Sequence, residues 1–277
     1  MSEISVRLVN NASTKKRPPA PRKKWKPGRL AMAILQIGML VAVFLAWYVF
    51  TKIGVLPKFF FGDPIFVAAQ IWSWIVTGEI VLHLAVTLAE TLLGFAIGAV
   101  FGVLAGLWLG LSPVAGALFD PYVKAINAMP RVILGPIFIL WFGLGITSKV
   151  ALGVSLVFFV VFFNVAQGVR EVSPVILANA RMLGANRQQL LRSVYIPSAL
   201  SWVFSSLHTS VGMAFVGAVV GEYLGSASGI GYLILQAEST FDVNAVFAGM
   251  LVLTVFALLL DTSITVIEKR LLRGRPR

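Results

Sequence analysis

A series of long apolar segments with few or no charges is the feature that most constrains this chain. The first, from Leu30 to Phe50, contains no charged residue. A helix needs about 20 apolar residues to cross the hydrocarbon layer of a bilayer. Lipid offers the backbone no hydrogen-bonding partner, so a spanning segment must be a helix or part of a closed barrel. Barrel strands alternate in hydrophobicity, whereas these runs are continuous, and we therefore expect an all-α, polytopic membrane protein.

About six transmembrane helices are expected. They lie at residues 30–50, 83–111, 114–146, 148–167, 198–221 and 243–267. One straight helix is not expected in the third segment, because prolines and a glycine interrupt it. These are Pro121, Pro130, Gly135 and Pro136. Residues 51–79 should form an external segment with one short interfacial helix after the Asp63-Pro64 start signal, and a second short external helix is expected over 230–238.

The charges of the chain are few and unevenly placed. Only 12% of the residues are charged, against about 25% in soluble domains, and the net charge is +12. Nine basic residues lie in residues 1–29, and five more follow Glu268. Basic flanks of this kind set membrane topology and contact anionic headgroups, so we do not expect nucleic acid as a partner. We expect a basic tail over 1–29, a membrane domain over 30–268 and a second basic tail over 269–277, with both termini cytoplasmic.

Several kinds of chemistry find no support in the residues. There is no cysteine, so disulfides and thiolate sites are excluded. His83 and His208 are too far apart in sequence to suggest a metal site, and no Ser/His/Asp set or paired carboxylates suggest catalysis. No Walker A pattern occurs. We expect neither an enzyme nor a metal or cofactor in this chain, and any nucleotide that drives transport should bind another chain.

A polar island at residues 168–197 separates two apolar spans. Pro174 is expected to start a helix, Gly184 to end it, Asn186 to cap a second short helix, and Pro197 to stop that one. Two short helices around a glycine would form a compact protruding elbow. From composition alone, this elbow is either a solvated loop with an amphipathic helix on the membrane surface or a docking element for a soluble partner.

Glycines recur at every fourth position of the second span and form one ridge. They are Gly94, Gly98, Gly102, Gly106 and Gly110. Small residues at this spacing let a neighbouring helix approach closely in a membrane. We interpret the ridge as a helix-packing surface.

Charged residues within or at the ends of spans are costly and usually face protein or water. They are Glu90, Lys124, Arg131, Glu222 and Asp261. Glu90 is expected to pair with Lys124 or Arg131, and Asp261 to lie near the inner interface. Glu222, beside a loop rich in glycine and serine, is a candidate for the translocation path. So are four polar residues near helix seams, namely Asn164, Gln167, His208 and Thr209, although all could simply bond across helices.

Residues 178–197 resemble the cytoplasmic loop signature of ABC importer permeases, E-A-A-x3-G-x9-I-x-L-P. The spacing from Gly184 to Pro197 is kept, whereas Ala178 replaces the usual Glu and Asn179 the first Ala, with conservative swaps at 194 and 196. Other stretches resemble the nitrate/sulfonate/taurine branch of these permeases. Among them are "LPKFFFGDP", "DPYVKAINAMPRVILGPIFILWFGLG" and "EYLGSASGIGYLI".

The resemblance implies a type I ABC importer permease fold in a bacterial inner membrane. Two permease copies would line the path for a small anionic or organic solute, two ATPase subunits holding ATP and magnesium would dock at the elbow, and an external solute-binding protein would deliver the solute. The implied ATPase contacts are Ala178, Asn179, Ala180, Arg181, Met182, Leu183, Gly184, Ala185, Asn186, Arg187 and Pro197.

Two other classes of function remain open at this point. A secondary transporter or channel acting alone would use Glu90, Glu222 and Asp261 as proton or ion sites. A membrane scaffold without transport activity would use the elbow only to recruit a soluble protein.

Overall fold

The computed structural model describes residues 28–272, and all regular structure within that range is helical. The expected tail over 1–29 lies outside the described residues except for residues 28 and 29, and of the expected tail over 269–277 residues 273–277 lie outside, whereas 269–272 continue helix α13 (Val243–Leu272). The chain divides into two compact units, residues 1–46 and residues 47–277. Helix α1 (Arg29–Lys52) begins in the first unit and matches the first expected span. Its 24 residues correspond to about 36 Å, enough to cross a bilayer.

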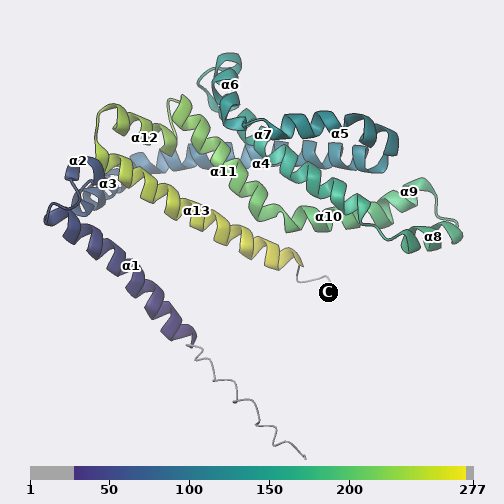
Figure 1. The fold of residues 1–277 in the computed structure, drawn as a ribbon, viewed down its shortest axis with the longest axis horizontal. Coiled ribbons are helices and arrows are strands. Elements are labelled where there is room, and N and C mark those ends of the chain that lie inside the picture. Colours follow the sequence, from purple (N-terminus) through teal and green to yellow (C-terminus); the bar gives the residue numbers. More distant parts are fainter. Residues whose placement is uncertain (1–27, 273–277) are drawn as a thin grey trace, which may run out of the picture. The chain divides into compact units, whose positions relative to one another are not determined.

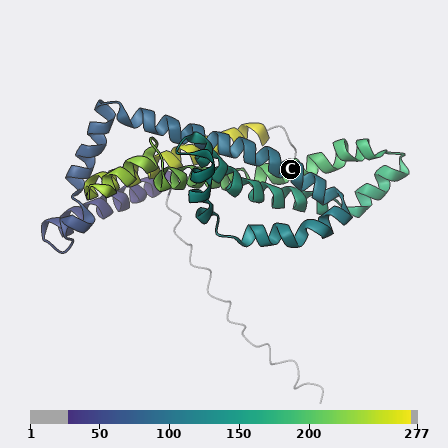
Figure 2. The ribbon, with the colours of Figure 1, turned by 90° about the horizontal axis from the view of Figure 1, so that it is seen from above.

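The centre of the second unit is a pair of long helices, α4 (Glu79–Leu111) and α7 (Ile146–Arg170), which lie side by side in Figures 1 and 2. Two shorter helices, α10 (Ile196–Ser205) and α11 (Leu207–Leu224), pack against α7. Valines at every fourth position of α7 face the glycines of α4, and they form one core cluster with residues of α10 and α11. The valines are Val157, Val161, Val165 and Val169.

The glycine ridge of α4 lies directly on α7, and its first four glycines are buried. A Cβ added at Gly102 would lie 2.8 Å from the carbonyl oxygen of Phe158 and 2.9 Å from the Cβ of Val161. Real Cβ atoms do not approach other atoms so closely, so the two helix backbones could not pack at this distance with larger residues. The contact is the small-residue packing typical of membrane helices.

A second core lies at one end of this unit. It joins α3 (Pro64–Val76), α12 (Ile230–Ser239) and α13 (Val243–Leu272), with α2 (Lys58–Phe61) beside α13. Asp63 caps α3, because its carboxylate accepts a hydrogen bond from the backbone N–H of Ile65. The short helices expected after Asp63-Pro64 and over 230–238 are both present.

The third segment is broken, as expected, but at one place only. Helix α5 (Pro113–Ala128) is followed by a 3-10 turn (Arg131–Ile133) and α6 (Leu134–Phe142), and the two parts bend by 76°. The break is at Met129 and Pro130, whose backbones are extended.

The breaks expected at Pro121, Gly135 and Pro136 were wrong. Pro121 lies inside α5, which continues through it; membrane helices tolerate such a proline because neighbouring groups satisfy the freed carbonyl. Gly135 and Pro136 lie in the first turn of α6, where an N–H has no partner within the helix and its absence costs little.

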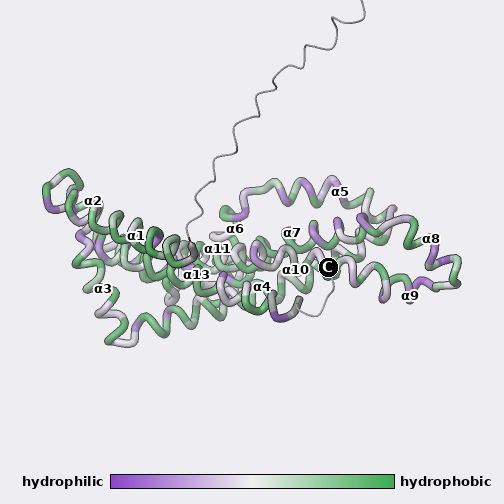
Figure 3. Tube along the Cα trace, turned by 90° about the horizontal axis from the view of Figure 1, so that it is seen from below, coloured by the Kyte–Doolittle hydropathy of each residue, from purple (hydrophilic) through white to green (hydrophobic). Residues whose placement is uncertain are grey.

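The polar island forms α8 (Pro174–Met182) and α9 (Arg187–Leu190). These helices project at the end opposite α2, α3 and α12 in Figure 1, and Figure 3 shows hydrophilic stretches along them. The expectation that Pro197 stops the second helix was wrong. A π-helical turn (Leu191–Tyr195) runs directly into α10, and Pro197 lies in the first turn of α10, where its missing N–H is not needed.

Seven segments are long and apolar enough to be candidate spans. Four are single helices, one joins α2 and α3, and two are bent pairs, Pro113–Phe142 and Arg187–Leu224, the latter bent by 57°. All six expected spans are among them. The seventh is Lys58–Val76, which the sequence pattern had placed outside the membrane.

Candidate functional site

Local hydrogen bonds hold the elbow (residues 174–197) in one shape. Gly184 adopts a positive φ of 84° after α8, which favours glycine. Its N–H donates to the carbonyl of Arg181, and the N–H of Ala185 donates to the carbonyl of Ala180, which is the Schellman pattern of helix ends. Asn186 then forms a capping box with Gln189 through bonds of 2.7 and 2.9 Å. The connection between the two helices therefore has a defined geometry.

The tip of the elbow, Arg181 to Arg187, carries apolar side chains that no other part of residues 28–272 covers. Met182 is 79% exposed and Leu183 is 89% exposed. The flanking Arg181 and Arg187 are exposed as well. Large exposed apolar side chains rimmed by charges mark interaction surfaces, so this geometry suits contact with another molecule.

A cavity of about 360 Å³ lies near the same end of the bundle, between α4, α5, α7 and α10. Two of the residues predicted for a translocation path, Asn164 and Gln167, line it. Asn164 donates to the carbonyl of Val160, and Gln167 donates to Glu171. Polar groups around it also include Asp120, Lys124, Arg170 and Trp202. The sequence analysis did not single out Asp120 or Trp202.

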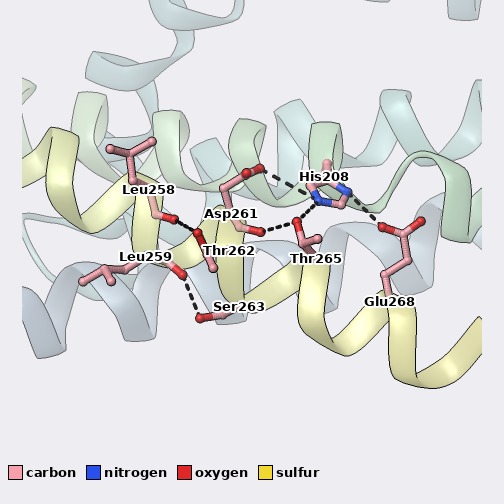
Figure 4. Close-up of polar contacts among 8 residues, drawn as sticks. All are labelled: His208, Leu258, Leu259, Asp261, Thr262, Ser263, Thr265 and Glu268. Carbon is pink, nitrogen blue, oxygen red and sulfur yellow. Dashed lines mark hydrogen bonds and ion pairs between the residues drawn. The ribbon is translucent and has the colours of Figure 1, made fainter. Parts of the chain in front are cut away.

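The other predicted path residues are not at this cavity. His208 turns toward α13, where its Nε2 lies 2.9 Å from the hydroxyl of Thr265 and its Nδ1 lies 3.3 Å from Glu268, as Figure 4 shows. Asp261 is also beside this ring, at 3.9 Å. Thr209 is exposed. His208 and Asp261 therefore connect α11 to α13 in this conformation.

Glu222 is fully buried and fastens the start of α12. Its carboxylate accepts hydrogen bonds of 2.7 Å from the hydroxyl of Thr87 and from the backbone N–H of Gly231. The two preceding backbone N–H groups also have acceptors. Ile230 N–H donates to Thr87 Oγ1, and Gly229 N–H donates to His83 Nδ1. The first N–H groups of a helix need such partners and favour a negative charge. Glu222 thus acts as the cap of α12.

The expected pairing of Glu90 with Lys124 or Arg131 was wrong. Glu90 is buried on α4, and its carboxyl faces that of Glu222, with the charge of Lys149 nearby. Lys124 instead pairs with Asp120 at 2.6 Å, one turn away on its own helix. The error arose because the short 112–113 connection makes α4 and α5 neighbours but does not fix which faces meet.

Sequence reasoning missed the partners of Glu222. His83, Thr87 and Thr91 recur at every fourth position of α4, and all are buried. This spacing puts them on one face of the helix, and it was a signal available in the sequence. Lys149, in the first turn of α7, was not singled out either; it is buried and donates to the carbonyl groups of Leu144 and Gly145.

Residues 98–273 match a family described as the binding-protein-dependent transport system inner membrane component. The chain is 31% identical to an aliphatic sulfonates transport permease protein, SsuC, of Bacillus subtilis, over 98% of this chain and 95% of that protein. It is 27% identical to the taurine transport system permease protein TauC of Escherichia coli, over 90% and 93%. It is 32% identical to the riboflavin transport system permease protein RibX of Chloroflexus aurantiacus, over 85% and 87%.

The fold is also similar to a solved one. The MetNI methionine ABC transporter in inward-facing conformations contains a chain that aligns with a TM-score of 0.59 at 19% identity, over 70% of this chain and 95% of that one. At this identity the likeness concerns the fold.

Proposed function

This chain belongs to the family of inner membrane components of binding-protein-dependent transport systems, and on that premise we propose that it imports a small sulfonate or a similar small oxyanion. It is the permease subunit of an ABC importer, a class that works with an ATPase and a binding protein. The relatives named for sulfonates and taurine, with the coverage of nearly the whole chain in the Bacillus subtilis protein, support the substrate class.

The elbow and both termini lie on the cytoplasmic side in this proposal. The charge distribution supports it, because the elbow and both tails carry clusters of basic residues. Six crossings are required. The segment Lys58–Val76 does not cross. It is interrupted between α2 and α3, where Asp63 forms an ion pair of 3.0 Å with Lys58, and α3 alone covers only about 20 Å. A crossing needs about 30 Å.

ATPase subunits dock at the elbow tip. The single observation that supports this proposal most strongly is the exposed pair Met182 and Leu183 between two capped helices. Apolar side chains that enter a partner's pocket provide much of an interface's binding energy. The exposed Arg181 and Arg187 supply polar contacts at the rim. A connection held by a Schellman turn and a capping box can transmit displacement, since it does not bend freely.

The assembly has two permease copies, two ATPase subunits and one external binding protein. ATP and magnesium bind to the ATPase subunits, which carry out hydrolysis. The cavity bordered by Asn164 and Gln167 lies on the cytoplasmic part of the path, because it is close to the elbow end of α7. Glu222, His208 and Thr209 no longer belong to the proposed path, since the first two fasten helices and Thr209 lies away from the cavity.

A secondary transporter acting alone is not favoured. It would need Glu90, Glu222 and Asp261 to meet a solute or proton pathway. Glu90 and Glu222 are almost completely buried. Asp261 lies on α13, beside His208 of α11.

The test of the elbow is a Leu183→Asp variant, co-expressed with its ATPase and reconstituted in proteoliposomes. A charge at this position should prevent docking, because it would be desolvated in an apolar pocket. We expect the ATPase to be lost from the purified complex and transport to fall to background, while the permease remains inserted and monodisperse. Gly184→Pro should have the same effect, since proline cannot adopt φ of 84°.

Gln188→Ala is the matched control, because Gln188 is exposed on α9 but lies outside the tip. It should retain the ATPase. Normal ATPase binding by Leu183→Asp would contradict the proposed docking surface. A separate assay with ethanesulfonate and taurine, delivered by the external binding protein, tests the substrate class. Uptake of neither sulfonate by the wild-type complex would reject it.

A further inference from the structure

Arg131 lies at the break between α5 and α6, and its side chain is half-buried. Its guanidinium stacks over the ring of Phe159 on α7, with Cζ 4.3 Å from the ring centre. Phe159 is about 20 Å along α7 from Ile146 and about 16 Å from Arg170. A bilayer's hydrocarbon layer is about 30 Å thick, so Arg131 is near the midplane. A lipid headgroup would have to leave the interface to reach it.

The positive charge of Arg131 has no counter-ion in the part of the chain that the structure describes. No carboxylate from residues 28–272 forms an ion pair with it. One nitrogen, Nη2, donates to the carbonyl and to the side-chain oxygen of Asn127, one turn earlier. Its Nε is buried and has no hydrogen-bonding partner. Asp120, on the preceding helix α5, is already paired with Lys124.

The other charged side chains discussed for the spans have ionisable neighbours of the opposite type. Glu90 and Glu222 share a site with Lys149, and Asp261 and Glu268 lie beside His208. A desolvated cation without a partner is costly in a membrane and usually serves function. The side chain is only half-buried, so it is open to a ligand. Its unused N–H groups lie in a fixed fork, which matches the oxygens of a sulfonate or carboxylate.

We propose that Arg131 is the group that recognises the transported oxyanion at mid-membrane, with Asn127 and Phe159 as its positioning residues. This inference rests on the proposed function and specifies where its substrate class is read. Asn127 fixes one edge of the guanidinium, and Phe159 supports its face. The N–H groups of Nη1, which is neither bonded within the described residues nor buried as Nε is, remain available to the anion.

The test compares variants of the complete reconstituted importer with ethanesulfonate as the probe. Arg131→Gln removes the charge, and we expect uptake to fall about 10- to 100-fold, the range for losing a charged hydrogen bond. Arg131→Lys keeps the charge but not the fork, so its uptake should lie between that of Arg131→Gln and the wild type. ATP hydrolysis stimulated by the binding protein should persist in both variants, because neither changes the elbow.

Asn127→Asp separates recognition from a structural role. The aspartate has the shape of asparagine and retains the bond to Arg131, so a purely structural arginine would be undisturbed or better held. For an anion site, the new carboxylate occupies the positive charge and repels the substrate, and we expect at least about a tenfold loss of uptake. The matched control is Gln236→Glu, the same type of change at an exposed position of α12, which should leave uptake unchanged.

The outcomes distinguish the two proposals. If the wild-type complex imports ethanesulfonate and both Arg131→Gln and Asn127→Asp import it normally, the role of Arg131 is rejected and the substrate class stands. If the wild-type complex imports neither ethanesulfonate nor taurine, the substrate class is rejected, and the role of Arg131 as an anion site is rejected with it.

Discussion

Two groups of charged residues inside the spans differ in how well they are satisfied. Glu222 lies with Glu90 and Lys149 at the level of the start of α7. It is almost completely buried, and its carboxylate accepts hydrogen bonds from the Thr87 hydroxyl and the Gly231 N–H. Arg131 lies beside Phe159 at the middle of α7 and is half-buried. Its partners are the neutral residue Asn127 and the aromatic ring of Phe159. Both groups are intramembrane charges, which sequence reasoning treats alike. Their surroundings indicate that the first fastens helices and the second is available to a ligand.

Glu222→Ala should have the largest effect on stability. It leaves the buried Gly231 N–H without an acceptor, leaves the Thr87 hydroxyl only the carbonyl of His83, and removes a negative charge close to Lys149. Losing one partner of a buried charged group costs about 3–5 kcal/mol. We expect lower yield of folded complex and a lower midpoint of thermal unfolding in detergent. Transport per folded complex should stay near normal, and a selective loss of transport at unchanged stability would break the distinction between the two groups.

Gly102→Val tests the packing of α4 on α7, which involves no charge. The new side chain would collide with the Phe158 carbonyl and Val161. Overpacking of this kind costs about 1–3 kcal/mol. The thermal midpoint should fall by less than with Glu222→Ala. Gly38→Val on α1 is a suitable control, since a Cβ there has nothing within 4 Å; equal destabilisation by both valines would show that close approach of α4 and α7 is not the cause.

Glu90→Gln should have the smallest effect and would sharpen the comparison. One oxygen of Glu90 is buried without a partner, and its carboxyl faces that of Glu222. A neutral amide can donate to the Glu222 carboxylate, so the change should shift stability by less than about 1 kcal/mol. Thermal unfolding and ethanesulfonate uptake measure it. A strong dependence of uptake on Glu90 at unchanged stability would make the buried group part of the path.

Much of the fold could be predicted from the sequence because lipid restricts a chain to few solutions. The length of each apolar run predicted its helix, and the glycine spacing on α4 predicted a close helix contact. Helix ends with their own capping residues were also predictable, as at Asp63 and Asn186. In these cases the physical cause lies within a few residues of the feature.

Pairing between distant segments could not be predicted in the same way. Glu222 meets Thr87 across 135 positions of the chain, and only the packing of α4 on α11 brings them together. The sequence identified Arg131 as an unusual charge, but its lack of a counter-ion depends on which faces of α4, α5 and α7 meet. Prolines were misjudged for a related reason, since the cost of Pro136 and Pro197 depends on whether they lie in a first turn.

The most direct test of the account is the ratio of ethanesulfonate imported to ATP hydrolysed, measured side by side for Arg131→Gln and Glu222→Gln in proteoliposomes with the binding protein. Glu222→Gln keeps an oxygen for Gly231 and should retain a near-normal ratio in the complexes that fold. Arg131→Gln should hydrolyse ATP with little import, so its ratio should fall about tenfold or more. A normal ratio for Arg131→Gln together with a collapsed ratio for Glu222→Gln would contradict the account.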